Sequence, residues 1–234
     1  MNSIFVTGTD TGSGKTIVTG LLAKYLADQG LKIITQKWIQ TGSKGFPEDI
    51  TVHLRLMGKS KSDVKNLLKY INPYCFKFPA SPHLSAKLEG KKINLKKIID
   101  SYNHLKQSFD SIIVEGLGGA LVPYNNKNMV IEITKKLKIP AIIVAKNQLG
   151  CINHTLITIE ALKKRNINIL GIIFNDHNPK KKDIVKDDNM KIIQKLSKVQ
   201  YLGSLPWTSN INILKKSFKP IGGKIVSKLR TVKH

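Results

Sequence analysis

The chain has 234 residues, of which 41 % are hydrophobic and 23 % are charged, and this balance excludes disordered, collagen-like and disulfide-rich miniprotein classes. The net charge is +24, which raises the question of a polyanionic partner. Among the 39 basic residues only Arg55, Arg165 and Arg230 are arginines, the side chains best suited to reading phosphates and bases. Because the lysines are spread along the chain, we do not expect nucleic-acid binding.

The cysteine content and the apolar runs indicate the compartment. Cys75 and Cys151 are too few and too far apart for a disulfide framework or a metal cluster, which fits a reducing environment. The first residues lack the basic and long apolar regions of a signal peptide. No stretch approaches the roughly 20 apolar residues that span a membrane. We therefore expect a cytoplasmic protein without a membrane segment.

Short β-branched apolar runs alternate with helical patterns along the chain. Continuous apolarity is typical of strands that are buried on both faces. The patterns predict strands over residues 3–6, 32–36, 111–114, 141–144 and 169–174, and helices over residues 15–29, 94–105 and 153–164. Strands that alternate with helices favour an α/β fold with a doubly wound, mostly parallel sheet, in one domain over residues 1–234. Residues 59–84 and the tail after Pro206 give no clear pattern.

A small-residue turn follows the first predicted strand and leads into the first predicted helix, at residues 8–16. This context is the one that a phosphate-binding loop requires. The backbone N–H groups of Gly12, Ser13 and Gly14 can bind phosphate oxygens, Lys15 can reach the terminal phosphates, and the Thr16 hydroxyl can bind magnesium. The alternative is a glycine turn that only caps a helix. We predict a nucleoside triphosphate as the ligand.

The loop is a shifted form of the general phosphate-loop pattern. That pattern places its first glycine where Thr9 stands, whereas Gly8 comes one residue earlier. With this shift, the run from Gly8 to Thr16 resembles the loop of dethiobiotin synthetases. Six further blocks resemble that family, in order and with similar spacing: residues 37–42, 72–74 with 80–83, 114–119, 149–154, 175–176 and 202–207. The resemblance covers about residues 3–207.

The resemblance implies a P-loop NTPase-like fold with a shifted Walker A loop. The implied activity is ATP-dependent ring closure of 7,8-diaminononanoate with CO2, through a carbamate and its phosphoric anhydride, to dethiobiotin, ADP and phosphate. The implied cofactors are ATP, as co-substrate, and Mg2+. The implied assembly is a homodimer that binds the substrate carboxylate across its interface. Both chemical steps concentrate negative charge, so we expect a site rich in cations and N–H donors.

The resemblance also assigns roles at the carboxyl ends of the strands. Lys37 contacts the carbamate and the transferred phosphate, with Lys15 and with Thr11 as a hydroxyl donor. The metal ligands are Thr16, Glu115 and an aspartate after the second strand, for which Asp49 is the best candidate. From position alone, Lys37 could be a surface lysine and Glu115 a salt-bridge partner. Asp49 or its neighbour Glu48 could instead cap a helix that starts near Ile50.

Further residues are assigned to the nucleotide base and to the substrate. Asn175 reads the adenine ring, and Gly203, Leu205 and Pro206 form the wall of that pocket. The substrate residues implied by the resemblance are Thr41, Ser81, Gly118, Gly150, Cys151, Ile152 and Asn153. The last four precede a predicted helix, whose free N–H groups suit a carboxylate. Cys151 could equally be a small buried thiol, and Asn153 a helix N-cap.

Two positions depart from the family pattern. Gly12 and Ser13 replace the usual Glu and Val, which makes the loop more flexible and removes a carboxylate beside the nucleotide. Trp38 replaces the usual Pro after Lys37, and we expect a differently shaped pocket there.

Two other classes of protein remain open at this stage. One is a nucleotide-switched ATPase of the ParA/MinD type, which would leave the blocks at residues 114–119 and 149–154 unexplained. The other is a related cofactor-synthesis amide ligase with a different acceptor, which the fold alone does not exclude.

Overall fold

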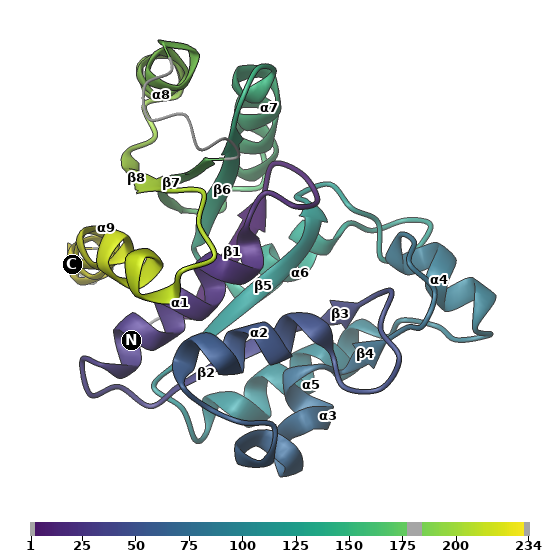
Figure 1. The fold of residues 1–234 in the computed structure, drawn as a ribbon. Helices are drawn as coiled ribbons and strands as arrows, with labels where there is room; N and C mark the ends of the chain where they lie inside the picture. Colours follow the sequence, from purple (N-terminus) through teal and green to yellow (C-terminus); the bar gives the residue numbers. More distant parts are fainter. Residues whose placement is uncertain (1–2, 177–183, 232–234) are drawn as a thin grey trace.

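A six-stranded parallel sheet organises the computed structural model, which describes residues 3–176 and 184–231 (Figure 1). The strand order is β2-β5-β1-β6-β7-β8, and every pair of neighbours is parallel. The strands are β1 (Ile4–Gly8), β2 (Ile33–Lys37), β5 (Ser111–Gly119), β6 (Ala141–Asn147), β7 (Ile169–Asp176) and β8 (Tyr201–Leu205). The predicted doubly wound sheet is therefore confirmed.

Helices connect these strands, and a short parallel pair lies beside the main sheet. The pair is β3 (Ile39–Gln40) with β4 (Tyr74–Cys75). The helices are α1 (Lys15–Ala27), α2 (Glu48–Met57), α3 (Leu68–Ile71), α4 (Pro82–Leu88), α5 (Leu95–Lys106), α6 (Val130–Leu137), α7 (Cys151–Lys163), α8 (Ile184–Ser197) and α9 (Ile211–Thr231), with a 3-10 helix at Ser62–Leu67. Among the described residues, none of the helices has the length and apolarity needed to cross a membrane.

The three predicted helices and the first five main-sheet strands all form, with shifted ends. The strand predicted over residues 111–114 extends to Gly119, because the glycines after Glu115 continue the pairing with β1. The helix predicted from residue 153 begins at Cys151, since Gly150 adopts the left-handed conformation and ends the preceding turn. Helix α9 lies in the tail after Pro206, which shows no clear pattern in the sequence, and strand β8, just before it, was not predicted.

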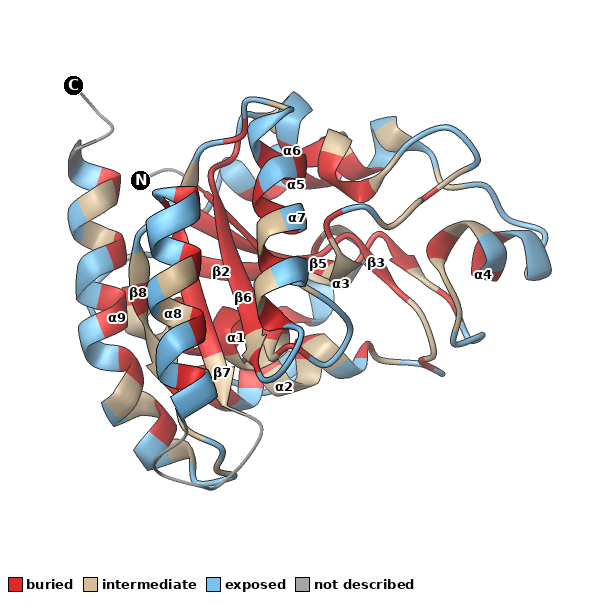
Figure 2. Ribbon diagram, turned by 90° about the horizontal axis from the view of Figure 1, so that it is seen from above, coloured by how far each residue is buried: buried red, intermediate tan, exposed pale blue. Residues whose placement is uncertain are grey.

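The core has two halves, one on each face of the sheet. In β1, Ile4 and Val6 pack toward α1 and α9, which lie side by side, whereas Phe5 packs toward α5, α6 and α7. Figure 2 shows the buried strands between helices whose outer faces are exposed. Alternate side chains of a strand point to opposite faces, so a strand between two helical layers must be apolar throughout.

Strand β1 lies at the point where the chain changes direction across the sheet. Its neighbours are β5 on one side and β6 on the other. Ligands of open α/β sheets bind at the carboxyl ends of the strands at such a switch point. The loop from β1 to α1, with the ends of β2 and β5, occupies this position.

Helices α1 and α2 approach closely at Gly20. A Cβ there would lie 2.6 Å from Leu56 Cδ1 and 3.3 Å from the Cα of His53. We expect Gly20→Ala to lower the free energy of unfolding by about 1–2 kcal/mol, because overpacking outweighs the gain in helix propensity. Urea unfolding would measure this.

The matched control is Gly223→Ala in α9, whose Cβ would meet nothing nearer than Tyr25 Oη at 3.7 Å. This change should stabilise by up to about 1 kcal/mol, as alanine favours a helix. Equal effects of the two changes would contradict the proposed close packing of α1 and α2.

Candidate functional site

The loop between β1 and α1 depends on three glycines. Gly12 and Gly14 have φ of 68° and 98°, a region that disfavours other residues. A Cβ at Gly14 would collide with the side-chain amide of Asn175, and a Cβ at Gly8 would collide with Ser13 Oγ. The early position of Gly8 therefore has a steric reason in this loop.

Lys15 is the first residue of α1 and folds back over the loop. Its Nζ donates to the carbonyl oxygen of Asp10 at 2.9 Å, and the side chain is buried. Burial, and then the nearby charge of Lys37, lower the pKa of Lys15 to about 8. Asp10 holds the turn by accepting from the N–H of Thr11. An anion at this loop would compensate the cost of the buried ammonium.

Lys37 ends β2 and lies between two carboxylates. Its Nζ is 2.8 Å from Asp49 Oδ2, 2.8 Å from Glu115 Oε1 and 2.7 Å from the carbonyl oxygen of Gly116. Burial favours the neutral amine, but Glu115 and Asp49 outweigh it and raise the pKa of Lys37. The side-chain amide of Asn72 donates to the Lys37 carbonyl and fixes the strand end.

Glu115 is a buried carboxylate in the middle of β5. Its Oε1 faces Lys37, and its Oε2 lies 2.7 Å from His53 Nε2. Burial alone would raise the pKa of Glu115, but Lys37 and His53 together lower it to about 2. The carboxylate is therefore ionised throughout the physiological range.

The Thr16 hydroxyl lies between the two carboxylates. Its oxygen is 3.0 Å from Glu115 Oε1 and 3.3 Å from Asp49 Oδ1. One hydroxyl has one hydrogen, so it can donate to only one of these oxygens at a time. Three hard oxygen ligands that converge in this way fit Mg2+, which takes one or two carboxylates and completes its shell with phosphates and water.

Of the two candidate carboxylates, Asp49 and Glu48, only Asp49 faces the other site residues. Both residues lie in the first turn of α2, whose N-cap is Pro47, and no side chain caps this helix. Asp49 points toward Lys37 and Thr16, whereas Glu48 is exposed. Asp49 is therefore the carboxylate that the fold brings to Glu115.

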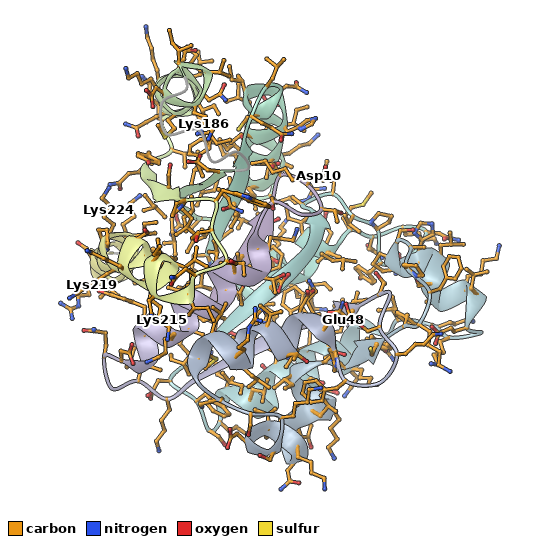
Figure 3. The ribbon with its side chains drawn as sticks, in the orientation of Figure 1. Asp10, Glu48, Lys186, Lys215, Lys219 and Lys224 are labelled. Atoms are coloured by element: carbon orange, nitrogen blue, oxygen red, sulfur yellow. The ribbon has the colours of Figure 1, made fainter. Side chains whose placement is uncertain are left out.

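An open cavity of about 840 Å³ joins these groups at the carboxyl ends of the strands. Of the residues expected in the site, it is lined by Thr11, Gly12, Gly14, Lys15, Thr16, Lys37, Thr41, Asp49, Ser81, Glu115, Gly118 and Asn175. The lysines on α9 that Figure 3 labels, Lys215, Lys219 and Lys224, lie away from Asp10 and its loop. Within the cavity lining, Lys15 and Lys37 supply positive charge.

Comparison with known proteins decides the family. An AAA domain family matches residues 2–213. The ATP-dependent dethiobiotin synthetase BioD 2 of Haemophilus influenzae is 41 % identical over 174 residues, which are 74 % of this chain and 91 % of that protein. The BioD synthetase of Thermodesulfovibrio yellowstonii is 33 % identical over 89 % of this chain and 90 % of its own length. The chain belongs to the dethiobiotin synthetase family.

Solved structures place this chain in the P-loop NTPase fold. MinD of Pyrococcus horikoshii, complexed with Mg-ADP, has a TM-score of 0.61 at 17 % identity, covering 100 % of this chain and 99 % of MinD. The pNOB8 ParA protein, bound to nonspecific DNA, has a TM-score of 0.62 at 14 % identity, covering 98 % and 99 %. Likenesses at this identity show the shared fold alone.

Some residues that the family resemblance assigned lie outside the cavity. Ser13 is fully buried, and its carbonyl accepts from the Asn175 amide at 3.2 Å. Gly203 and Leu205 lie in β8 and Pro206 follows it, and Trp207, which we did not predict, lines the cavity instead. Asn175 lines the cavity while it also supports the loop.

The residues at positions 150–153 form a separate group at the start of α7. Gly150 is the N-cap with φ of 86°, so the alternative of Asn153 as N-cap is wrong. Asn153 lies within the first turn and is exposed. Cys151 is buried, with its Sγ 3.5 Å from Thr155 Oγ1, and burial raises the pKa of its thiol. The small buried thiol is the role that this geometry favours.

The structure shows what surrounds Gly12 and Trp38, two residues that depart from the family pattern. A Cβ at Gly12 would lie 3.5 Å from the Nζ of Lys146, a half-buried side chain at the end of β6. Lys146 therefore lies beside the loop at Gly12, one of the two positions that depart from the family pattern. Trp38 does not line the cavity. It is buried in the core, stacked on Phe5 with ring centroids 5.4 Å apart.

Four residues of the site region were not predicted from the sequence. They are His53, Asn72, Lys146 and Trp207. Asn72 and Trp207 belong to blocks that resemble the family, which was the available signal. His53 and Lys146 carry no local signal, because their roles arise from contacts between distant elements.

Proposed function

We propose that this chain is an ATP-dependent dethiobiotin synthetase, which closes a ureido ring on 7,8-diaminononanoate with CO2. The observation that carries the proposal is the convergence of Lys37, Glu115 and Asp49 at the first turn of α1, where the Lys37 ammonium lies 2.8 Å from each carboxylate and both carboxylates face Thr16. Family membership and the fold of the phosphate loop agree with it.

The reaction has three steps in this proposal. One substrate amine attacks CO2 and loses a proton to give a carbamate. A carbamate oxygen then attacks the γ-phosphorus of ATP, which forms a carbamic-phosphoric anhydride and releases ADP. The second amine attacks the anhydride carbon, closes the ring and expels phosphate.

The loop and Lys15 hold the triphosphate in this scheme. The N–H groups of the loop and the N-terminus of α1 face the phosphates, and Lys15 exchanges the Asp10 carbonyl for a phosphate oxygen. When bound, Mg2+ would supply positive charge that offsets the negative charge of the phosphates. Thr16, Asp49 and Glu115 are the residues that would hold it.

Lys37 changes partners in this proposal. Without ligand, its ammonium neutralises the carboxylates of Glu115 and Asp49. It thereby does what a divalent cation would do between the same two carboxylates. In the reaction the Lys37 ammonium would contact the carbamate and the transferred phosphoryl group, and Glu115 and Asp49 would be left to hold the cation. Preorganised cations aimed at developing charge are among the largest contributions to such reactions. Thr11, Thr41 and Ser81 are the polar side chains of the same cavity that can orient the diamine.

A homodimer is the assembly that we propose, with the substrate carboxylate bound by the α7 N-terminus across the interface. The Cys151 N–H donates to the Gln148 carbonyl, which leaves the N–H groups of Ile152 and Asn153 for an anion. Leu121, Leu149 and Ile157 are exposed by 45 %, 87 % and 48 % near this helix. A hollow of about 250 Å³ lies between Leu121 and Ile157.

We expect Ile157→Glu to weaken the dimer by about 2 kcal/mol or more, because it would bury an unpaired charge in the interface. Analytical ultracentrifugation over a concentration series would measure the shift from dimer to monomer. The control is Leu88→Glu at the end of α4, which is 56 % exposed and lies outside the proposed interface. A monomeric wild type, or equal weakening by both variants, would contradict the interface.

Product analysis tests the proposed activity. Purified protein is mixed with diaminononanoate, bicarbonate, Mg2+ and ATP, and dethiobiotin and ADP are measured by mass spectrometry and a coupled assay. We expect the two products in equal amounts and no ADP without the diamine. Folded protein that makes no dethiobiotin would contradict the proposal. ADP release with another amine acceptor would favour the related ligase.

The nucleotide-switch alternative is tested by DNA affinity. It shares the fold with this chain, but it leaves the blocks at residues 114–119 and 149–154 unexplained. Loose attraction by lysines is screened at about 0.15 M salt. We expect no ATP-dependent binding to duplex DNA at that ionic strength.

A further inference from the structure

His53 is a buried histidine that the scheme above does not use. It lies in α2, one helical turn after Asp49, and its side chain is fully buried. Its Nε2 is 2.7 Å from Glu115 Oε2, so two side chains of one helix face, at positions i and i+4, reach the same carboxylate cluster. The position of α2 that allows this depends on Gly20, beside which the His53 backbone packs.

The two oxygens of Glu115 have different partners. Oε1 contacts Lys37 Nζ at 2.8 Å and Thr16 Oγ1 at 3.0 Å, on the side of the phosphate loop. Oε2 faces His53, on the side of α2. Because the carboxylate can only accept, the hydrogen of this contact belongs to His53 Nε2. His53 Nδ1 is buried without a partner among the described residues.

We propose that His53 is a positioning residue that holds Oε2 of Glu115, so that Oε1 alone faces Thr16, the metal and Lys37. This inference rests on the proposed magnesium role of Glu115. The hydrogen bond fixes the rotation of the carboxylate and makes it a ligand with one free oxygen. Side chains that hydrogen-bond to a metal ligand in this way often set metal affinity.

Without the donor, Oε2 would be a buried oxygen with no partner. The carboxylate could then rotate and place both oxygens on the Lys37 ammonium, which is already 2.8 Å from Oε1. A paired Glu115 would bind the metal less well, and it would keep Lys37 from the transferred phosphate. Loss of the His53 donor should therefore weaken the Mg2+ dependence of nucleotide binding. The loop and Lys15 should bind phosphate as before.

Two variants separate positioning from packing. His53→Leu keeps an apolar volume of similar size without a donor, and His53→Gln keeps an N–H that reaches the same carboxylate. Calorimetric titration with ADP at a series of Mg2+ concentrations gives the Mg2+ concentration for half-maximal enhancement of binding. A titration without metal gives the affinity of the loop alone, and urea unfolding gives the stability.

We expect His53→Leu to raise the half-maximal Mg2+ concentration by about tenfold or more. Its metal-free ADP affinity should equal that of the wild type, and His53→Gln should restore most of the Mg2+ response. Equal Mg2+ responses of the Leu variant and the wild type would overturn the inference, as would a loss of metal-free ADP binding that matches the loss with metal. A wild type that binds ADP without any response to Mg2+ would instead overturn the proposed metal role.

A spectroscopic measurement on the wild type covers the case in which His53→Leu does not fold. Nitrogen-15 NMR of labelled histidine distinguishes the two tautomers of the buried ring. We expect the hydrogen on Nε2, both without ligand and with Mg2+ and ADP bound. A hydrogen on Nδ1 instead of Nε2 in either state would overturn the inference.

Discussion

Lys37→Met is expected to lower the rate of dethiobiotin formation by about 10²–10³-fold, the usual cost of removing one group that stabilises the transition state. The same change should lower the free energy of unfolding at neutral pH by about 3–5 kcal/mol, because it leaves a buried carboxylate without its cation. Both effects come from one ammonium, which contacts Glu115 and Asp49 at 2.8 Å.

The pH dependence of stability should reverse in this variant. In the wild type the pKa of Glu115 is about 2, below its ordinary value of 4.5, so its contribution is present above pH 4.5 and is lost as pH falls toward 2. Without Lys37, burial dominates and raises the pKa of Glu115 above its unfolded value. The variant should then lose stability as pH rises through the ordinary range of a carboxyl group.

Urea unfolding between pH 4 and pH 8 would measure the difference between the two proteins. Lys219→Met is the matched control, since this lysine is exposed on α9 and lies away from the loop. We expect the control to keep the wild-type activity and pH profile. A Lys37→Met protein whose stability changes with pH as the wild type does would contradict the buried pairing.

Lys15→Met is expected to lower the rate of product formation by at least about a hundredfold, since it removes a cation from the terminal phosphates. The ligand-free variant should nevertheless be more stable than the wild type, by about 1–3 kcal/mol. Burial and the charge of Lys37 lower the pKa of Lys15 to about 8, so folding at neutral pH carries the cost of a buried ammonium.

The stability difference between Lys15→Met and the wild type should also depend on pH. The folded-state pKa of Lys15 lies below its ordinary value of 10.5, so the cost is full below pH 8 and disappears as pH rises toward 10.5. The stability difference between Lys15→Met and the wild type should shrink over that range. Lys24→Met, which removes only an exposed pair with Asp28 on the same helix, should show no such change. A ligand-free Lys15→Met protein that is less stable than the wild type would contradict the account.

Local sequence patterns were sufficient to predict the fold class and the phosphate loop. The loop can be predicted because its glycines, Lys15 and Thr16 are consecutive, and because a strand must precede it and a helix must follow it. Lys37 and Glu115 could be predicted as neighbours since parallel strands end at one edge of a sheet. The register pairs these two residues directly.

Contacts between distant elements could not be predicted. His53 reaches Glu115 only because α2 packs against α1 at Gly20, and no pattern around residue 53 reveals that approach. Trp38 follows a site residue in sequence, but the strand alternation directs its ring into the core, onto Phe5. Lys146 reaches the loop across the β1–β6 pair, at a position where Gly12 leaves space.

The most direct test is a crystal structure with Mg2+, diaminononanoate and a non-hydrolysable ATP analogue. We predict that the triphosphate lies on the loop from Gly8 to Thr16 and that the metal is bound by Thr16, Asp49 and Glu115. The Lys37 ammonium should have moved from the carboxylates to the terminal phosphate. A nucleotide bound elsewhere, or a Lys37 that still pairs with both carboxylates beside a bound nucleotide, would contradict the account.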